Sequence, residues 1–255
     1  MKQSPLITLI ALVCLLCAGT ASAQKTYVVA VGLGEYQYPQ IAPPLPCAVN
    51  DARAVARFFH DYNDSHVFLL LNANATRSHI LRVLKTEFTK STADDEIIFV
   101  FSGHGTKGGL TTYDVQYTST IITYNEIQGI MKAAKARRKI ILANACYSGG
   151  LTLRQPRQPG VRQPRRQTDR TSVMLYTSSR AGEVSWARSD MANSFFFSRI
   201  LEAFGGEADR NGDRKITARE LFNYVNSNVV SDTGGEQHPQ MWGSFDDSMV
   251  VVYVK

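Results

Sequence analysis

Five short runs of the chain are continuously apolar and rich in Val, Ile and Phe, as in strands that are buried on both faces of a parallel sheet. They span residues 26–32, 66–71, 97–105, 139–150 and 172–177. A further strand is predicted near the end of the chain, at residues 249–254. Two of the runs, 97–105 and 139–150, stop abruptly in small residues, as strands do when they end at a site.

Apolar residues recur at helical spacing in the segments between these runs. Helices are predicted at residues 48–62, after the expected cap Thr76, and at residues 124–136, 195–204 and 218–228. Residues 106–120 are rich in Gly, Thr and Tyr, which predicts a hairpin or loop. The alternation of strands and helices predicts an α/β fold, a three-layer α/β/α sandwich around a mostly parallel sheet of roughly six strands.

Reactive side chains come at the ends of the two abruptly ending runs. His104 lies in Ser-Gly-His-Gly, and Cys146 lies in Asn-Ala-Cys-Tyr-Ser-Gly. Open parallel sheets bind ligands at the carboxyl ends of their strands, so adjacent strands of this kind bring an imidazole and a thiol into one crevice. A histidine can lower the pKa of a nearby thiol or protonate a leaving amine. The pair indicates a cysteine nucleophile.

These motifs, SGHG and ACxSG, resemble those of the caspase and metacaspase group of cysteine peptidases. Cys146 follows His104 by 42 residues, close to the roughly 50-residue interval of caspases. The residue two places before the cysteine is Asn144, so the motif is neither the Gln-Ala-Cys of caspases nor the Asp-Ala-Cys of metacaspases, and it is nearer the second. The resemblance implies a caspase-like fold and a cysteine endopeptidase that acts on peptides or proteins.

The resemblance also implies the roles of individual residues. Cys146 is the nucleophile, His104 is the acid and base, and the backbone N–H groups of Gly105 and Cys146 form the oxyanion hole. No third member of a triad is evident, in agreement with a Cys-His dyad. Five residues are expected to line the substrate groove. They are Asp51, Ser102, Asn144, Ser185 and Trp186.

Two of the groove residues have plainer interpretations. Asp51 is also a good residue for the start of a helix, and Trp186 could be a core residue. On specificity, caspases hold an aspartate through an arginine ahead of this helix, and the stretch here has none. Metacaspases hold arginine or lysine through acidic groups, one of which is replaced here by Asn144. Asp51 and Ser102 remain, so cleavage after Arg or Lys is expected.

The first 23 residues are predicted to be a signal peptide. Lys2 precedes an apolar run that is too short to span a membrane, and Ala-Ser-Ala at residues 21–23 forms a cleavage site. Residues 24–255 are predicted to be one caspase-like peptidase domain, secreted or periplasmic, monomeric and not attached to a membrane. Cleavage leaves Cys47 and Cys146, which could form a disulfide in an exported protein. A disulfide does not explain SGHG, however, and Cys47 is predicted to be a small buried residue.

The formal charge of +6 is concentrated in residues 151–170. This segment has six arginines, three prolines and a single acidic residue, and no apolar periodicity. It cannot pack as a core element and is predicted to be a mobile linker. By resemblance it is the place where caspases are cut during maturation, which implies a zymogen that processes itself. A solvated basic loop or a polyanion-binding segment is the alternative, and no nucleic-acid partner is expected because the rest of the mature chain is neutral.

Residues 209–220 match a calcium loop in part. The candidate ligands at its first, third, fifth, seventh and twelfth positions are Asp209, Asn211, Asp213, Lys215 and Glu220. Glycine belongs at the sixth position, where this chain has Arg214. The alternative is an ordinary turn that caps the following helix. The predicted chemistry requires no cofactor, and Ca²⁺ is the one candidate ion.

Two other functions remain open. The first is a binding protein with a caspase-like fold that no longer cleaves, and the second is a cysteine transpeptidase. The presence of both His104 and Cys146 favours an enzyme, because a binding protein is free to lose either residue.

Overall fold

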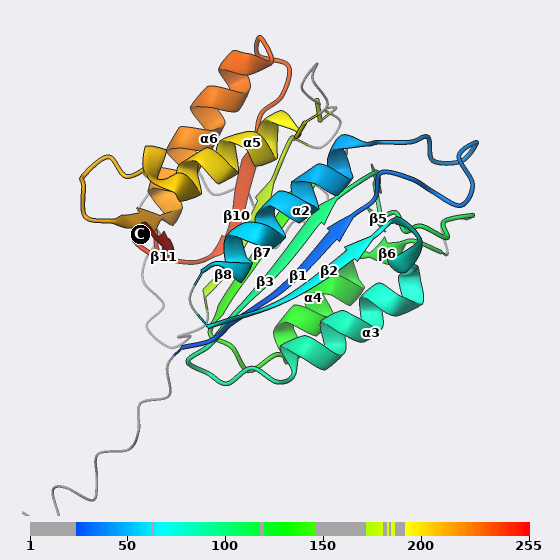
Figure 1. Ribbon diagram of the computed structural model, residues 1–255, viewed down its shortest axis with the longest axis horizontal. Helices are drawn as coiled ribbons and strands as arrows, with labels where there is room; N and C mark the ends of the chain where they lie inside the picture. The colour runs from blue at the N-terminus through cyan, green and yellow to red at the C-terminus, as the bar shows by residue number, and fades with distance from the viewer. Residues whose placement is uncertain are drawn as a thin grey trace, which may run out of the picture.

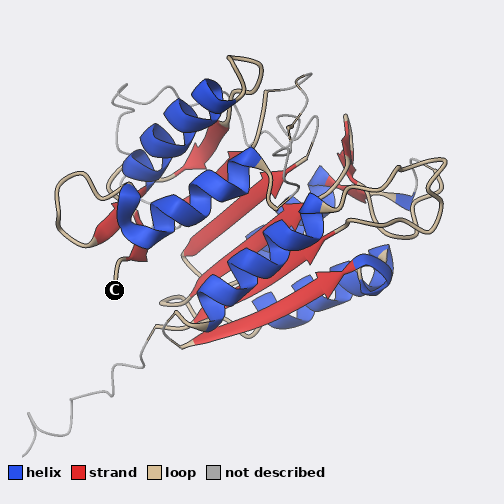
Figure 2. Cartoon of the chain, turned by 45° about the horizontal axis from the view of Figure 1, so that its top comes forward, coloured by secondary structure: helices blue, strands red, loops and turns tan. Residues whose placement is uncertain are grey.

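The computed structural model describes residues 24–62, 64–117, 120–145, 172–180, 183, 185–186 and 192–255. Its centre is a six-stranded sheet with the strand order β10-β8-β7-β3-β1-β2 (Figures 1 and 2). Its parallel strands are β1 (Thr26–Gly32), β2 (Ser65–Leu71), β3 (Glu96–Ser102), β7 (Arg138–Asn144) and β8 (Ser172–Thr177). Strand β10 (Gln240–Ser244) runs antiparallel to β8. The predicted mostly parallel sheet is confirmed.

Helices cover both faces of the sheet (Figure 1). One face carries α2 (Cys47–His60), α5 (Phe195–Glu202) and α6 (Ala218–Asp232), and the other carries α3 (Arg77–Phe88) and α4 (Tyr124–Ala133). Successive strand side chains point to opposite faces, so Val28 packs in the core under α2 whereas Val29 packs in the core under α3 and α4. The result is the predicted three-layer sandwich.

Short elements fill the connections. The segment after β3 forms a three-stranded sheet of β4 (Gly105–Thr106), β5 (Gly109–Leu110) and β6 (Ile122–Thr123) where a hairpin or loop is predicted. A 3-10 turn, η1 (Asn72–Asn74), follows β2, and a π-helical turn, η4 (Ala203–Glu207), continues α5. Thr76 caps α3 as predicted, since its side chain accepts a hydrogen bond from the His79 backbone N–H. No helix within the described ranges is long and apolar enough to cross a membrane.

The C-terminal strands correct one expectation. The predicted last strand exists as β11 (Val250–Tyr253), but it pairs with β9 (Lys215–Thr217) in a separate two-stranded sheet. The sixth strand of the central sheet is β10, whose sequence QMWGS has no β-branched residue and gives a weak strand pattern. Gly243 in β10 has a φ of 126°, and a Cβ there would lie 2.0 Å from the Val173 carbonyl oxygen. Glycine is therefore required where β10 approaches β8.

Candidate active site

The carboxyl ends of β1, β3 and β7 lie at one edge of the sheet. Gly32 pairs with Ser102, and Ser102 pairs with Asn144, so the three strands end at the same level. Gly103 continues this alignment, because its backbone N–H donates to the Asn144 carbonyl at 3.1 Å. A Cβ at Gly103 would lie 3.0 Å from the Tyr36 hydroxyl and 3.1 Å from the Phe101 ring. The small residue after β3 is thus needed for close packing beneath His104.

The imidazole of His104 has a fixed orientation. Its Nε2 lies 2.8 Å from the carbonyl oxygen of Pro43, in the Pro-rich turn before α2. A carbonyl oxygen only accepts, so this contact assigns the proton to Nε2 and leaves Nδ1 as the atom that can take up a proton. The Pro43 carbonyl is a functional group that the sequence analysis missed, because nothing in a local pattern identifies a backbone acceptor 61 residues away.

Tyr36 and Thr111 hold the backbone of His104. The Tyr36 hydroxyl accepts a hydrogen bond from the His104 backbone N–H at 2.9 Å, and the two rings lie 5.3 Å apart. Burial raises the pKa of Tyr36 to about 12, so the hydroxyl stays protonated. Thr111 donates to the His104 carbonyl from its backbone N–H at 3.1 Å and from its hydroxyl at 2.7 Å. Hydrogen bonds therefore hold both the backbone N–H and the backbone carbonyl of His104.

Asp51 lies on α2 beneath the strand ends, and its side chain is fully buried. One carboxylate oxygen accepts from the Ser102 hydroxyl at 2.7 Å and from the Asn144 amide at 3.3 Å. The other accepts from the Asn193 amide at 3.0 Å and from the Ser194 backbone N–H at 2.9 Å. Burial raises the pKa of Asp51, and these hydrogen bonds oppose the shift. Asp51 forms no capping hydrogen bond at the start of α2, in contrast to the plainer interpretation of this residue as a helix-start residue.

Three predicted groove residues thus form one cluster, Asp51 with Ser102 and Asn144. The cluster also contains an unused acceptor, since the Asn144 side-chain oxygen is buried and has no hydrogen-bond partner among the described residues. Buried polar atoms normally have a partner. This oxygen is therefore available to a donor that the structure does not contain.

Ser185 and Trp186 lie in a second cluster beyond β8. The Ser185 hydroxyl lies 2.6 Å from that of Ser178, and the Trp186 backbone N–H donates to the Gln237 side-chain oxygen at 2.8 Å. Gln237 is fully buried, and its amide donates to the Ser178 carbonyl at 2.9 Å. The Trp186 side chain is 45% exposed, so its interpretation as a core residue is wrong. Gln237 was not predicted, since a lone glutamine between two loops gives no signal.

Cys146 lies outside the described residues, as do the linker 151–170 and the first 23 residues. Gly105 begins β4 directly after His104 and is partly buried. Cys47 is a free, buried cysteine, as predicted, which argues against its pairing with Cys146. Burial raises the pKa of the Cys47 thiol to about 11, so it is not a competing nucleophile.

The oxygen-bearing side chains of the calcium loop accept hydrogen bonds from backbone N–H groups of the same loop. Asp209 accepts from the backbone N–H groups of Gly212 and Arg214 at 2.9 Å each, and Arg214 adopts a left-handed φ of 60°. The Glu220 carboxylate accepts from the Thr217 backbone and hydroxyl in a capping box at the start of α6. Asn211 and Asp213 accept from backbone N–H groups two residues on, and Lys215 begins β9. In the part of the chain that the structure describes, no three His, Cys, Asp or Glu side chains gather as metal ligands. Calcium binding here stays a prediction.

Comparison with known proteins gives the family and the fold. A family model described as the caspase domain matches residues 27–249. The crystal structure of a Geobacter sulfurreducens protein is similar to this chain with a TM-score of 0.64 and 15% sequence identity. The likeness covers 91% of this chain and 100% of that one. A search of curated protein sequences found no match.

Proposed function

The chain belongs to the caspase family, which supports cysteine peptidase activity in general, and we propose that it is an endopeptidase with Cys146 as nucleophile and His104 as acid and base. The observation that carries this proposal is the equal level of Ser102 and Asn144 in the paired strands β3 and β7. His104 and Cys146 each follow their paired residue by two positions in the sequence.

The contacts of His104 support the proton transfers. The Pro43 carbonyl accepts from Nε2, so Nδ1 takes the proton of the Cys146 thiol as the sulfur attacks the scissile carbonyl. The same nitrogen then gives the proton to the leaving amine, and a water molecule releases the acyl group from the sulfur. The family resemblance assigns stabilisation of the oxyanion to the backbone N–H groups of Gly105 and Cys146.

Cleavage after Arg or Lys is the finer part of the proposal. Its support is the cluster of Asp51, Ser102 and Asn144, which combines a buried carboxyl with an unpartnered acceptor on Asn144. A guanidinium or ammonium group of a substrate would supply the missing donor. The Asp51 carboxylate is saturated, so such a substrate displaces the Asn193 or Ser194 hydrogen bond to reach it.

The test is turnover of fluorogenic peptides that end in Arg, Lys or Asp, measured for the wild type, Cys146→Ala and Cys47→Ala, with and without Ca²⁺. Cys47→Ala is the matched control because it removes the other cysteine of the mature chain, which is buried. Cleavage after Arg and Lys is expected in the wild type and Cys47→Ala, and none in Cys146→Ala. Cleavage after Asp alone would overturn the proposed specificity, and equal turnover by Cys146→Ala would overturn the nucleophile.

No cleavage of any peptide, even after limited proteolysis within 151–170, would favour the binding-protein interpretation. Transfer of the acyl group to an added amine in preference to water would favour the transpeptidase. Both outcomes leave the fold and the family intact and change only the reaction.

Self-processing is proposed for the Arg-rich segment 151–170, since it offers several Arg residues to a site that prefers them. Intact-mass spectrometry of purified wild-type and Cys146→Ala proteins tests this directly. We expect fragments that end at Arg in the wild type and an uncut chain in the variant. An identical uncut chain in both would refute self-processing.

A further inference from the structure

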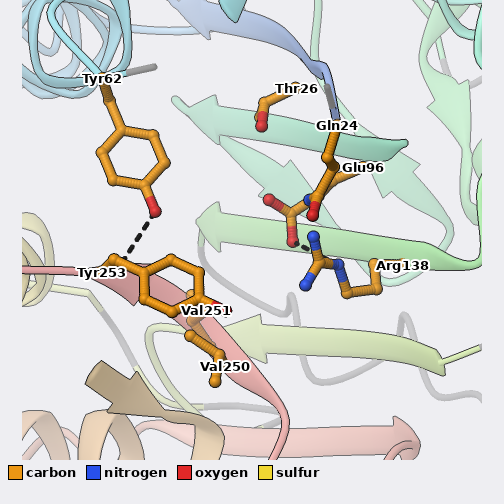
Figure 3. A pocket seen from close by; sticks show the side chains of 8 residues that line it. All are labelled: Gln24, Thr26, Tyr62, Glu96, Arg138, Val250, Val251 and Tyr253. Carbon is orange, nitrogen blue, oxygen red and sulfur yellow. Dashed lines mark hydrogen bonds and ion pairs between the residues drawn. The ribbon is translucent and has the colours of Figure 1, made fainter. Parts of the chain in front are cut away.

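A small cavity lies at the opposite edge of the sheet from the proposed active site. Here the first residues of three neighbouring strands pair in register, Thr26 of β1 with Glu96 of β3, and Glu96 with Arg138 of β7. The cavity has a volume of about 60 Å³ and lies between these strand starts and the C-terminal strand β11. Figure 3 shows the side chains of Glu96 and Arg138 pointing toward each other inside it.

Glu96 is the unusual group in this cavity. Its side chain is 4% exposed, and its Oε1 atom has no hydrogen-bond partner among the described residues. The Arg138 guanidinium forms an ion pair with Glu96, with Nε at 3.7 Å from Oε1, which is longer than a hydrogen bond. Burial raises the pKa of Glu96 to about 7, and the charge of Arg138 offsets only part of this effect. A buried carboxylate oxygen without a donor is costly to the folded protein.

The cavity also offers donors and an apolar wall. Arg138 is only partly buried, with 26% of its side chain exposed, and its guanidinium keeps N–H groups for an acceptor. The Tyr62 hydroxyl accepts from the Tyr253 backbone N–H at 2.8 Å, which leaves its own proton free to donate. Val250 and Val251 of β11 line the side opposite the strand starts (Figure 3). A carboxylate acceptor and a guanidinium donor therefore stand side by side, with hydrocarbon across from them.

We propose that this cavity binds an α-ammonium group together with the carbonyl or carboxylate oxygen beside it. The ammonium donates to Glu96 Oε1, and the neighbouring oxygen accepts from Arg138. A ligand with only a cation would meet the like charge of Arg138, and a ligand with only an anion would meet Glu96. The paired head group gives Glu96 a donor and Arg138 an acceptor at the same time.

The size of the cavity limits the ligand. A volume of about 60 Å³ holds the head group of a ligand, and the rest of a larger ligand would lie outside the cavity. Two sources carry this head group, a free small amino acid and the amino end of a peptide chain. Hydrolysis of a peptide bond also releases this group, although the inference does not depend on peptidase activity.

The experiment is titration of the purified protein with glycine, glycinamide, methylamine and acetate, followed by the unfolding temperature and by calorimetry. Glycine or glycinamide is expected to raise the unfolding temperature in a saturable way, and methylamine and acetate are not. Binding of glycine alone identifies a free amino acid as the ligand, and binding of glycinamide identifies the amino end of a peptide. No saturable binding of either, or equal binding of methylamine, would overturn the proposal.

Variants place the binding in the cavity. Glu96→Gln should weaken binding about tenfold or more, because a charged hydrogen bond is lost. Glu87→Gln is the matched control, since Glu87 is also a buried glutamate but lies on α3 and pairs with Lys90, just after the end of that helix. Arg138→Lys serves if Glu96→Gln fails to fold, and it should weaken binding of the oxygen end. Unchanged affinity in both cavity variants would assign the binding to another part of the protein.

Discussion

Two buried carboxyl groups, one at each edge of the sheet, differ in how many hydrogen bonds they accept. Asp51 at the carboxyl edge and Glu96 at the amino edge are both shielded from water, and burial raises the pKa of each. Asp51 accepts four hydrogen bonds, from side chains and a backbone N–H that come from three separate segments. Glu96 has one oxygen with no hydrogen-bond partner within the described residues, and this oxygen forms only a 3.7 Å ion pair with Arg138.

This difference changes what each carboxyl does. The acceptor sites of Asp51 are filled, and its hydrogen bonds connect α2 with the ends of β3 and β7 and with the start of α5. An unsaturated carboxylate gains from a new donor, as Glu96 does in the proposed ligand site. Burial alone therefore does not tell whether a carboxyl can accept a new donor without losing a hydrogen bond, whereas the number of hydrogen bonds does: Glu96 can, and Asp51 must first release one.

The largest effect is expected from Asp51→Ala. The substitution leaves the donors on Ser102, Asn144, Asn193 and Ser194 without their acceptor, and each buried donor left unpaired costs about 1–3 kcal/mol. Because some of these side chains can rotate, the expected loss in the free energy of unfolding is about 3–5 kcal/mol. Urea denaturation measures it. A loss below about 1 kcal/mol would show that the four donors find other partners.

Glu96→Gln should change the pH dependence of stability. The pKa of Glu96 is raised in the folded protein, so its contribution to stability is complete below the unfolded value near 4.5 and is lost as the pH rises through about 7. Relative to wild type, the variant should therefore be more stable at pH 8 than at pH 5, by up to about 3 kcal/mol. Urea denaturation at both pH values measures this difference.

Glu126→Gln is the control with the opposite sign. Burial alone would raise the pKa of Glu126, but hydrogen bonds from Thr123 and the charge of Arg77 lower it overall. Its contribution to stability is present at neutral pH and lost as the pH falls through the lowered value. A Glu96→Gln difference that followed the same direction as Glu126→Gln would contradict the assignment of a raised pKa to Glu96.

Asn144→Asp would add a second carboxyl beside Asp51 and restore the aspartate of the metacaspase motif. The Asn144 amide now donates to Asp51 at 3.3 Å, so the substitution replaces a hydrogen bond with the repulsion of two carboxyls. We expect a loss of about 1–3 kcal/mol at pH 8 that shrinks at pH 5, where the pair holds a proton. Thermal or urea unfolding at the two pH values tests it. Equal losses at both would mean that repulsion is not the cause.

The smallest effect is expected from Tyr36→Phe. The hydroxyl that accepts from the His104 backbone is lost, at a cost of about 1 kcal/mol in the free energy of unfolding. Peptide turnover should fall through kcat with KM little changed, because the imidazole and not the substrate loses its support. Tyr38→Phe is the matched control, since the Tyr38 hydroxyl contacts Gln116 and not His104. Equal kinetic losses in both variants would contradict a role of Tyr36 in positioning His104.

Much of the fold could be predicted because its causes are local. The parallel strands are continuous apolar runs, and β1 and β8 have the bounds that the pattern predicts. The cap Thr76 and the buried Cys47 likewise follow from residue type and neighbours. The sequence placed His104 directly after a strand of a parallel sheet, and the register of β3 with β7 confirms that these strand ends meet.

Long-range contacts were decided only by the tertiary structure. The Pro43 carbonyl at His104, and Asn193 and Ser194 at Asp51, join positions 61 to 143 residues apart in the chain. Strand β10 was missed because pairing with β8, not its own composition, makes it a strand. Periodicity and propensity describe what a segment buries, but they do not say which distant segment supplies a hydrogen bond. Which distant segments meet depends on how the layers pack. The same packing left Oε1 of Glu96 without a hydrogen-bond donor among the described residues.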